Sequence, residues 1–564
     1  MAHAAFYGFG AYAAGRLSMP IVHGLGVDGI LPGLGLPLIL AIAIAVILAF
    51  FLAFIIALPA LSRVTGDYLI LLTLAFQMIT NQLMSALDGV TGGSYGLKSV
   101  PPLSFFGQKL TQPINAVWFF LVVTSLVLFL CHFISASPYG RLLRGIREQD
   151  SAVRAVGKSS SLPKIMAFGF AGAIAAMVGG LNGAYYQLVV PNTFSLNLSI
   201  LVFSVVVLGG AGNLIGTVLV AFILTAIRPM IQAIAGDSAI AWQAVVYGLA
   251  LILIARFRPG GILPEGYGPR KFLSKFGNRG NLVGTELTKG VSTTHSNPLK
   301  AGVIVRVETK QNKDPILVVK DLTKSFGGVK AVQGVSFNLM PNQITGLVGP
   351  NGAGKTTVFN LITRSITPDS GSVFLNGRDI SHLSTVQIAK AGIARSFQDG
   401  RLFMQLSAID NVAMAVPNQL GESIIGLISR PIASMRRERL VRSKAIEALH
   451  YVGLNGNLEE YVGNMSYGDQ KLVAIARLIA TDCELLLVDE PTAGVDPSAV
   501  DKVIEAVLDL RNLGKTICLV EHSINMMGQL AEHVLFMDQG RVIAEGSLDT
   551  LMADKNLTEI YFGT

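Results

Sequence analysis

Charged residues are scarce in this chain. They make up 14% of its 564 residues, against roughly 25% in soluble proteins, and apolar residues make up 51%. The shortage is concentrated in residues 1–255, which hold few charges outside one basic loop, whereas residues 314–564 resemble an ordinary soluble domain. This distribution excludes a single soluble core and predicts a membrane domain followed by a soluble domain.

Cysteine is also scarce, and a secretion signal is lacking. Cys131, Cys483 and Cys518 have no spacing typical of a metal site or a disulfide. The N-terminus has no basic segment followed by a short apolar core, so we predict no signal peptide. The net charge is +8, and the basic residues cluster beside apolar segments. This placement favours loops that face membrane lipid over a nucleic-acid-binding surface.

Long apolar stretches fill the first half of the chain. Each is close to the roughly 20 residues that a membrane-spanning helix needs, and they lie near residues 37–60, 68–87, 116–136, 165–187, 213–234 and 239–255. A shorter run, Leu198 to Leu208, ends at the glycine-rich turn Gly209–Gly212. We therefore expect an all-α, polytopic membrane domain over residues 1–256.

Loop charge predicts the orientation of these helices. The basic segment 138–164 and the pair Arg256 and Arg258 are both expected on the cytoplasmic side. An even number of crossings must then separate them, although only three long apolar stretches do. The run 198–208 is therefore predicted to be a crossing or a re-entrant element that turns on the cytoplasmic side, before Asn213.

The apolar stretches contain no Asp, Glu, Lys or Arg in their central turns. His132 is the nearest exception, and we interpret it as an interfacial or packed residue. Carriers driven by ions usually need ionisable groups within the membrane. Their absence favours an external energy source.

Residues 140–157 have the pattern of a short amphipathic helix, with Leu142, Leu143, Ile146, Val153 and Val156 opposite a basic face. Two readings are open. The helix could rest on lipid headgroups, or it could dock into a motor domain and transmit its movement. The nucleotide motif described next favours docking.

The pattern changes after residue 256. Residues 257–313 are rich in Gly, Pro, Ser, Thr and basic residues, as in a flexible linker. From Ile316, short β-branched runs alternate with helical patterns, which predicts an α/β domain over 314–564.

One stretch of this domain predicts nucleotide binding. Gly349-Pro350-Asn351-Gly352-Ala353-Gly354-Lys355-Thr356-Thr357 fits the phosphate-loop pattern without a mismatch and follows the apolar run Ile344–Val348. The glycines let backbone N–H groups approach the phosphates. Lys355 is expected to reach the β- and γ-phosphates of ATP, and Thr356 to bind Mg²⁺.

Further residues complete the expected site. The buried run before Asp489 and Glu490 reads as a strand that ends in a magnesium ligand and a residue that polarises the attacking water. Ser466 is placed as the N-cap of a helix whose N–H groups can meet a phosphate. Phe326 can stack on adenine.

The order of these elements resembles an ATP-binding cassette (ABC) ATPase over essentially all of residues 314–564. The resemblance implies that Gln398 senses Mg²⁺ and the membrane domain, and that His522 contacts the γ-phosphate. It also implies that Ser466 and Gly468 close over the ATP of a partner subunit, and that Asp496 lies in a loop communicating across the dimer. Asp469 departs from the usual glutamine, which affects the contact with the opposing nucleotide.

A narrower resemblance covers both halves. The segment 394–403 and the Ser466-Tyr467-Gly468 signature are similar to the ATPase of branched-chain amino acid importers. Residues 58–68, 91–93, 140–148 and 207–213 resemble the permease of the same systems, which normally has about one further helix before a segment like Ala4–Tyr12.

The resemblance implies ATP-driven import of branched-chain amino acids across the bacterial inner membrane. The implied partners are a second permease subunit, a second ATPase subunit and an extracytoplasmic binding protein. Urea or short amides remain an alternative solute. A cassette protein acting on nucleic acid and a membrane sensor are disfavoured, because the chain has a membrane half and no visible output domain.

A basic stretch around Arg436–Arg439, with Arg430, Arg442 and Lys444, has two readings. It is either a solvated helix face or a contact with membrane phosphates or a permease loop.

Overall fold

The computed structural model describes residues 2–20, 33–63, 67–105, 108–110, 112–236, 239–258, 260–263, 314–396 and 401–562. The chain forms two compact units. We call Met1–Phe133 with Lys164–His295 the helical unit, and Ile134–Pro163 with Ser296–Thr564 the α/β unit. The basic segment after residue 134 thus folds with the α/β unit, although it lies within the predicted membrane domain. The predicted linker falls mostly outside the described residues.

Long apolar helices build the helical unit, as the sequence predicts. They are α1 (His3–Ser18), α2 (Leu38–Arg63), α3 (Asp67–Ala86), α5 (Pro113–Ser135), α7 (Ser161–Tyr186), α8 (Leu196–Gly209), α9 (Leu214–Ala235) and α10 (Ala239–Phe257). Short elements join them: α4 (Asp88–Thr91), η1 (Gly93–Tyr95), η2 (Pro191–Phe194) and the paired strands β1 (Leu97–Lys98) with β4 (Leu188–Val189) and β2 (Ser104–Phe105) with β3 (Gln108–Lys109). Arg228 lies within α9, between its middle and its C-terminal end, so the charge-free part of this predicted membrane span does not extend along the whole helix.

Among the described residues, five helices are long and apolar enough to cross a membrane. A sixth candidate is the bent pair Ile70–Ala86 and Asp88–Tyr95, whose two parts meet at 81°. The run 198–208 belongs to one of the five, because η2 and α8 together give a 19-residue span, Pro191–Gly209. The sequence-based expectation that this short run contributes a crossing therefore agrees with its length.

Glycines bring the first helix close to α7. A Cβ atom on Gly10 would lie 2.1 Å from the carbonyl oxygen of Ala176, and one on Gly179 would lie 1.9 Å from that of Tyr7. No other residue fits at such a backbone contact. Small residues near the N-terminus thus serve close helix packing, as membrane helices commonly require.

The turn between α8 and α9 lies at the same end of the helical unit as the end of α10. Ile262 N–H donates to the Leu208 carbonyl at 2.8 Å, and Leu263 N–H donates to that of Gly209 at 3.3 Å. Asn213 caps α9, because its side chain accepts from Gly216 N–H at 3.0 Å. Two helices, α9 and α10, separate these two points, so their shared end agrees with the prediction that the glycine-rich turn and Arg258 lie on the same side. Its cytoplasmic location stays a prediction.

Two sheets form the centre of the α/β unit, as predicted. The larger has the order β10 (Ile393–Arg395), β11 (Leu485–Asp489), β12 (Thr516–Val520), β7 (Ile344–Val348), β13 (His533–Asp538) and β14 (Arg541–Gly546). Its first five strands run parallel and β14 is antiparallel. The smaller sheet is antiparallel, with the order β6 (Val329–Leu339), β5 (Leu317–Phe326), β8 (Ser370–Leu375) and β9 (Arg378–Asp379).

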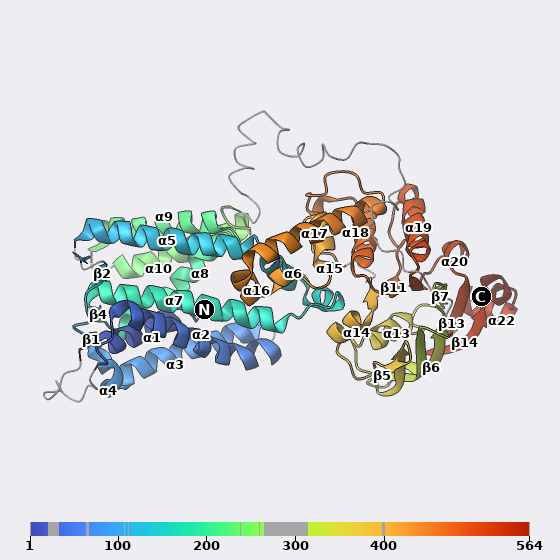
Figure 1. Cartoon of the computed structure of the whole chain (residues 1–564), viewed down its shortest axis with the longest axis horizontal. Coiled ribbons are helices and arrows are strands. Elements are labelled where there is room, and N and C mark those ends of the chain that lie inside the picture. The colour runs from blue at the N-terminus through green and yellow to red at the C-terminus, as the bar shows by residue number, and fades with distance from the viewer. Residues whose placement is uncertain are drawn as a thin grey trace, which may run out of the picture. The chain divides into compact units, whose positions relative to one another are not determined.

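Helices cover these sheets. α13 (Lys355–Ile362) follows β7, and α14 (Thr385–Ala391) precedes β10. The helices α15 (Ala408–Ala415), α17 (Pro431–Tyr451) and α18 (Tyr467–Ala480) pack on one another as one group (Figure 1). The remaining elements are η5 (Leu420–Glu422), α16 (Ile424–Ser429), η6 (Val462–Asn464), α19 (Pro497–Asn512), α20 (Ile524–Leu530), α21 (Leu548–Met552) and α22 (Lys555–Phe562).

The predicted amphipathic helix is α6 (Pro138–Ala155), capped by Ser137. It is broken at Gln149, whose φ of −150° and ψ of 90° are not helical. The break turns the last residues of α6 onto a new axis, so that its two parts present different side chains to the α/β unit.

Candidate nucleotide site and the α6 contact

The phosphate loop joins β7 to α13, and three of its glycines, Gly349, Gly352 and Gly354, have positive φ. Gly349 has φ +150° and Gly354 has φ +100°. A Cβ atom on Gly349 would lie 2.0 Å from the Met537 carbonyl oxygen, and one on Gly354 would lie 2.4 Å from that of Ala331. The loop is therefore pressed against neighbouring backbone, and Gly540 N–H fixes it further by donating to the Ala353 carbonyl at 3.0 Å. Thr356 is exposed at the start of α13.

Lys355 curls back over this loop. Its Nζ donates to the carbonyls of Gly349 at 2.7 Å and Pro350 at 3.0 Å. Burial lowers the pKa of Lys355, and the charges of Glu490 and Asp489 oppose that shift. The structure thus brings the predicted lysine and the two predicted carboxylates within electrostatic reach of one another.

Asp489 ends β11 as predicted and is 1% exposed. Its Oδ2 accepts from Arg395 at 3.2 Å, and Arg395 also donates to Asn360 at 2.6 Å. Burial raises the pKa of Asp489, while Arg395 opposes that rise. The other oxygen, Oδ1, is buried without a hydrogen-bond partner among the described residues. A buried acceptor of this kind suits a cation or its bound water.

Glu490 is held in an unusual conformation beside His522. Its φ is +47°, which a residue with a side chain seldom adopts. Its Oε1 lies 2.7 Å from His522 Nε2, and its carbonyl accepts from Lys471 at 3.1 Å. Strained backbone of this kind is frequent at functional sites. Glu490 and His522, which the sequence analysis identified in separate motifs, are therefore in hydrogen-bonding contact.

Ser466 caps α18 and is also bound by Asp469. Its Oγ accepts from Asp469 N–H at 3.2 Å and donates to Asp469 Oδ2 at 2.8 Å. The carboxylate at the unusual position 469 therefore holds the serine hydroxyl. Gly468 lies in the first turn, where a Cβ atom would be 3.0 Å from that of Ala499.

The other predicted residues differ in their surroundings. Phe326 is 46% exposed at the end of β5, with Lys324 Nζ 5.7 Å from its ring centre. Asp496 caps α19 by accepting from Ser498 N–H at 2.9 Å. Gln398 lies outside the described residues, so its predicted roles keep the status of predictions.

The apolar side of α6 packs on the rest of the α/β unit. One buried cluster unites residues of α6 with residues that follow the predicted Gln398 segment: Leu142, Ile146, Ala152, Val153, Phe403, Leu406 and Met414. Gly145 faces Met414 so closely that a Cβ atom there would be 2.8 Å from Met414 Cε. The expected docking of this helix against the motor domain is therefore observed.

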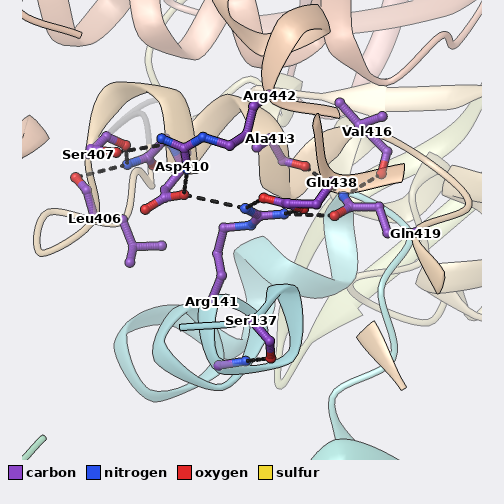
Figure 2. A network of polar contacts seen from close by, with 12 residues as sticks. Ser137, Arg141, Leu406, Ser407, Asp410, Ala413, Val416, Gln419, Glu438 and Arg442 are labelled. Carbon is purple, nitrogen blue, oxygen red and sulfur yellow. Dashed lines mark hydrogen bonds and ion pairs between the residues drawn. The ribbon is translucent and has the colours of Figure 1, made fainter. Parts of the chain in front are cut away.

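The polar contacts of α6 centre on a buried arginine (Figure 2). Arg141 Nη1 lies 2.6 Å from Glu438 Oε1 and 3.4 Å from Asp410 Oδ1, and Nη2 lies 2.8 Å from Gln419 Oε1 and 3.1 Å from Glu438 Oε2. Lys158 forms a second contact, donating to Val416 O at 2.7 Å and Glu422 Oε2 at 2.9 Å.

Sequence reasoning missed Asp410, Gln419, Glu422 and Glu438. Each is an ordinary polar residue more than 250 positions from its partner, which is Arg141 on α6 or Lys158 just after it. One feature of the sequence could have indicated a contact partner: Glu438 is an acidic residue within the basic stretch of α17. That stretch has mixed surroundings, since Arg442 pairs with Asp410 at 3.3 Å and Lys444 with Asp482 at 3.5 Å. The residue of this stretch that bonds to Arg141 of α6 is the acidic Glu438.

Comparison with known proteins gives two independent matches. Residues 332–493 match the family described as ABC transporter, and residues 1–255 match the family described as branched-chain amino acid transport system / permease component.

Individual relatives align with a little under half of the chain. The high-affinity branched-chain amino acid transport ATP-binding protein LivG of Salmonella typhimurium is 35% identical over 251 residues, which is 44% of this chain and 98% of LivG. The high-affinity branched-chain amino acid transport ATP-binding protein BraF of Pseudomonas aeruginosa is 33% identical over 250 residues, which is 44% of this chain and 98% of BraF. A crystal structure of a nucleotide-free ATP-binding cassette from an ABC transporter aligns at 30% identity over 44% of this chain and 100% of its own, with a TM-score of 0.39.

Proposed function

Because the chain belongs to the ABC transporter family and joins a permease component to an ATP-binding cassette, we propose that it imports branched-chain amino acids. It would do so as a fused permease and ATPase subunit of a larger transporter in the bacterial inner membrane. The observation that carries this proposal is the agreement of the two halves. Each was matched separately, and both point to branched-chain amino acid transport systems.

The hydrolytic step is assigned to the strained carboxylate. Glu490 would orient and polarise the water that attacks the γ-phosphate, because it directly follows strand β11 and its carboxylate is 8% exposed. His522 holds Glu490 at 2.7 Å and would contact the γ-phosphate. Lys355 would exchange its bonds to the loop carbonyls for bonds to the β- and γ-phosphates, and Phe326 offers an exposed ring for adenine.

The residues present fit a magnesium ion that arrives with ATP. The unpartnered Oδ1 of Asp489 and the exposed hydroxyl of Thr356 would hold it, with Gln398 as a third candidate. Mg²⁺ supplies neutralisation of the charge on the phosphates. No group of three metal-ligating side chains occurs among the residues that the structure describes.

A complete site is proposed to need a second cassette. In this family one cassette supplies the phosphate loop and its partner supplies the signature. Ser466 and Gly468 would therefore act on ATP bound to the partner, where the start of α18 offers backbone N–H groups. One permease half also needs a second. We thus expect a partner ATPase, a partner permease and an extracytoplasmic binding protein.

We assign α6 to coupling. It packs on the residues that directly follow the Gln398 segment, so movement within the cassette would displace α6. The helices on either side of it, α5 and α7, are long and apolar enough to span a bilayer.

Uptake by reconstituted vesicles tests the proposal. The full chain would be incorporated with its partner subunits and binding protein, with ATP at the cassette side and labelled leucine or urea at the other. Leucine uptake that requires ATP, and that is lost in Glu490→Gln, is expected. Uptake of urea in preference to leucine would assign a different solute, and ATP-independent uptake of either would refute an ATP-driven mechanism.

A further inference from the structure

The contact between α6 and the α/β unit contains a receptor for one particular side chain. We call Asp410, Gln419 and Glu438 the acceptor cup, since together they take up the Arg141 guanidinium (Figure 2). The side chain of Arg141 is 4% exposed, and those of Asp410 and Glu438 are 21% exposed. A charge this well removed from water is stable only when its partners are well placed.

Two of the three cup residues are held in place by partners other than Arg141. Both hydrogens of the Gln419 amide are used at the end of α15, since Nε2 donates to Ala413 O at 2.6 Å and Val416 O at 2.8 Å. The amide oxygen must therefore point outward as an acceptor. Asp410 Oδ1 also accepts a hydrogen bond from Arg442 Nη1 at 3.3 Å, which holds the carboxylate in place. The cup thus offers acceptors only, in the fork geometry that a guanidinium matches.

Arg141 is suited to this cup in a way that lysine is not. Burial alone would lower the pKa of Arg141, but the hydrogen bond and charge of Glu438, with Asp410 and Glu422, outweigh it and the pKa is raised. Lys158, the other buried cation of this contact, shows the contrast. Its burial lowers its pKa in spite of Glu422. A point charge also cannot make two parallel bonds to Glu438 while reaching Gln419.

A helix without this arginine would leave the Glu438 carboxylate and the Gln419 amide oxygen without their guanidinium partner, and Asp410 with Arg442 as its cationic partner. Such an arrangement raises the free energy of docking for helices that lack this arginine more than it stabilises docking of the helix that has it. The apolar cluster of α6 cannot discriminate in this way, because many amphipathic helices could fill it.

We infer that Arg141 is the specificity-determining residue for docking, so that the acceptor cup admits only a membrane-domain loop carrying an arginine at this position. The inference rests on the proposed role of α6 in coupling. It has a consequence for assembly. Since the cup of this cassette is filled by α6 of its own chain, this cassette does not serve the second permease, which must dock on a different cassette.

The test compares four variants of the full chain, assembled with its partner subunits in lipid nanodiscs: Arg141→Ala, Arg141→Lys, Arg141→Glu and the charge exchange Arg141→Glu with Glu438→Arg. Arg147→Ala is the matched control, because Arg147 lies on the exposed side of α6 and donates to Gln405 at 3.0 Å. Hydrogen exchange of residues 138–155 reports docking directly. ATP hydrolysis with and without binding protein reports coupling.

Arg141→Ala and Arg141→Lys are expected to lower amide protection of α6 at least tenfold and to abolish stimulation by the binding protein, with basal hydrolysis within about twofold of the parent. Arg147→Ala should change protection less than twofold. The charge exchange should regain protection relative to Arg141→Glu alone. Full protection in Arg141→Lys, or no gain from the exchange, would overturn the inference.

The docking readout needs no substrate. If the parent chain shows arginine-dependent protection yet fails to import leucine, the proposed function falls and the inference stands. If the parent imports leucine and Arg141→Lys is indistinguishable from it in both assays, only the inference falls. Should Arg141→Ala misfold, Arg141→Lys and the charge exchange decide the question.

Discussion

Truncating Leu142 should loosen α6 without damaging the cassette. Leu142 is 2% exposed and packs in the cluster with Phe403, Leu406 and Met414, yet it belongs to α6 and not to the core of the α/β unit. Leu→Ala changes at buried sites cost about 2–5 kcal/mol. The lower end applies here, because Leu142 also borders a cavity of about 600 Å³ from which water can enter the vacated space.

A loss of about 2 kcal/mol corresponds to a roughly 30-fold fall in the ratio of docked to undocked α6. Hydrogen exchange by mass spectrometry on residues 138–155 of the full chain would measure it. Leu143→Ala is the control, since it removes the same atoms from a neighbour that is only half-buried. It should lower protection no more than about fivefold, equivalent to roughly 1 kcal/mol. Equal effects of the two variants would show that burial against the cassette does not hold α6 in place.

The nucleotide site yields three further predictions. Glu490→Gln should lower ATP hydrolysis at least about 10²-fold while ATP stays bound, as measured by turnover and by filter retention of labelled ATP; undiminished turnover would remove Glu490 from its role. Gly349→Ala should lower ATP affinity and the thermal midpoint far more than Gly352→Ala, since a Cβ would be 2.0 Å from Met537 O at the first position and would meet nothing within 4 Å at the second; similar losses would contradict the clash. Burial raises the pKa of Cys518 to about 12, so N-ethylmaleimide at pH 8 should modify it only after unfolding, which intact mass would reveal; rapid labelling of the native chain would refute its burial.

The nucleotide site was predictable because its residues lie in short, local patterns. The run Ile344–Val348 became β7 with unchanged ends, and Leu485–Asp489 became β11. A strand buried on both faces has an unbroken apolar run, and the chemistry begins where that run stops. Ser466 was likewise predictable as a cap, since capping depends on residues only three positions apart.

The surroundings of α6 were not predictable to the same depth. Its apolar face was visible in the spacing of Leu142, Ile146 and Val153, but Arg141 beside it reads as a solvated residue. Its burial is decided by Glu438, which is 297 positions away, and no local pattern links the two. The break at Gln149 also has no glycine or proline to announce it.

This long separation has a consequence for biosynthesis. The ribosome makes Arg141 first and adds Glu438 297 residues later, an interval of about 15–60 s at roughly 5–20 residues per second. Throughout that time the newly made α6 has no receptor to cover its leucine and isoleucine side chains. We expect lipid headgroups or a chaperone to cover the apolar side chains of α6 until the cassette has folded. Docking of α6 on the cassette would then be a late step in the maturation of the protein.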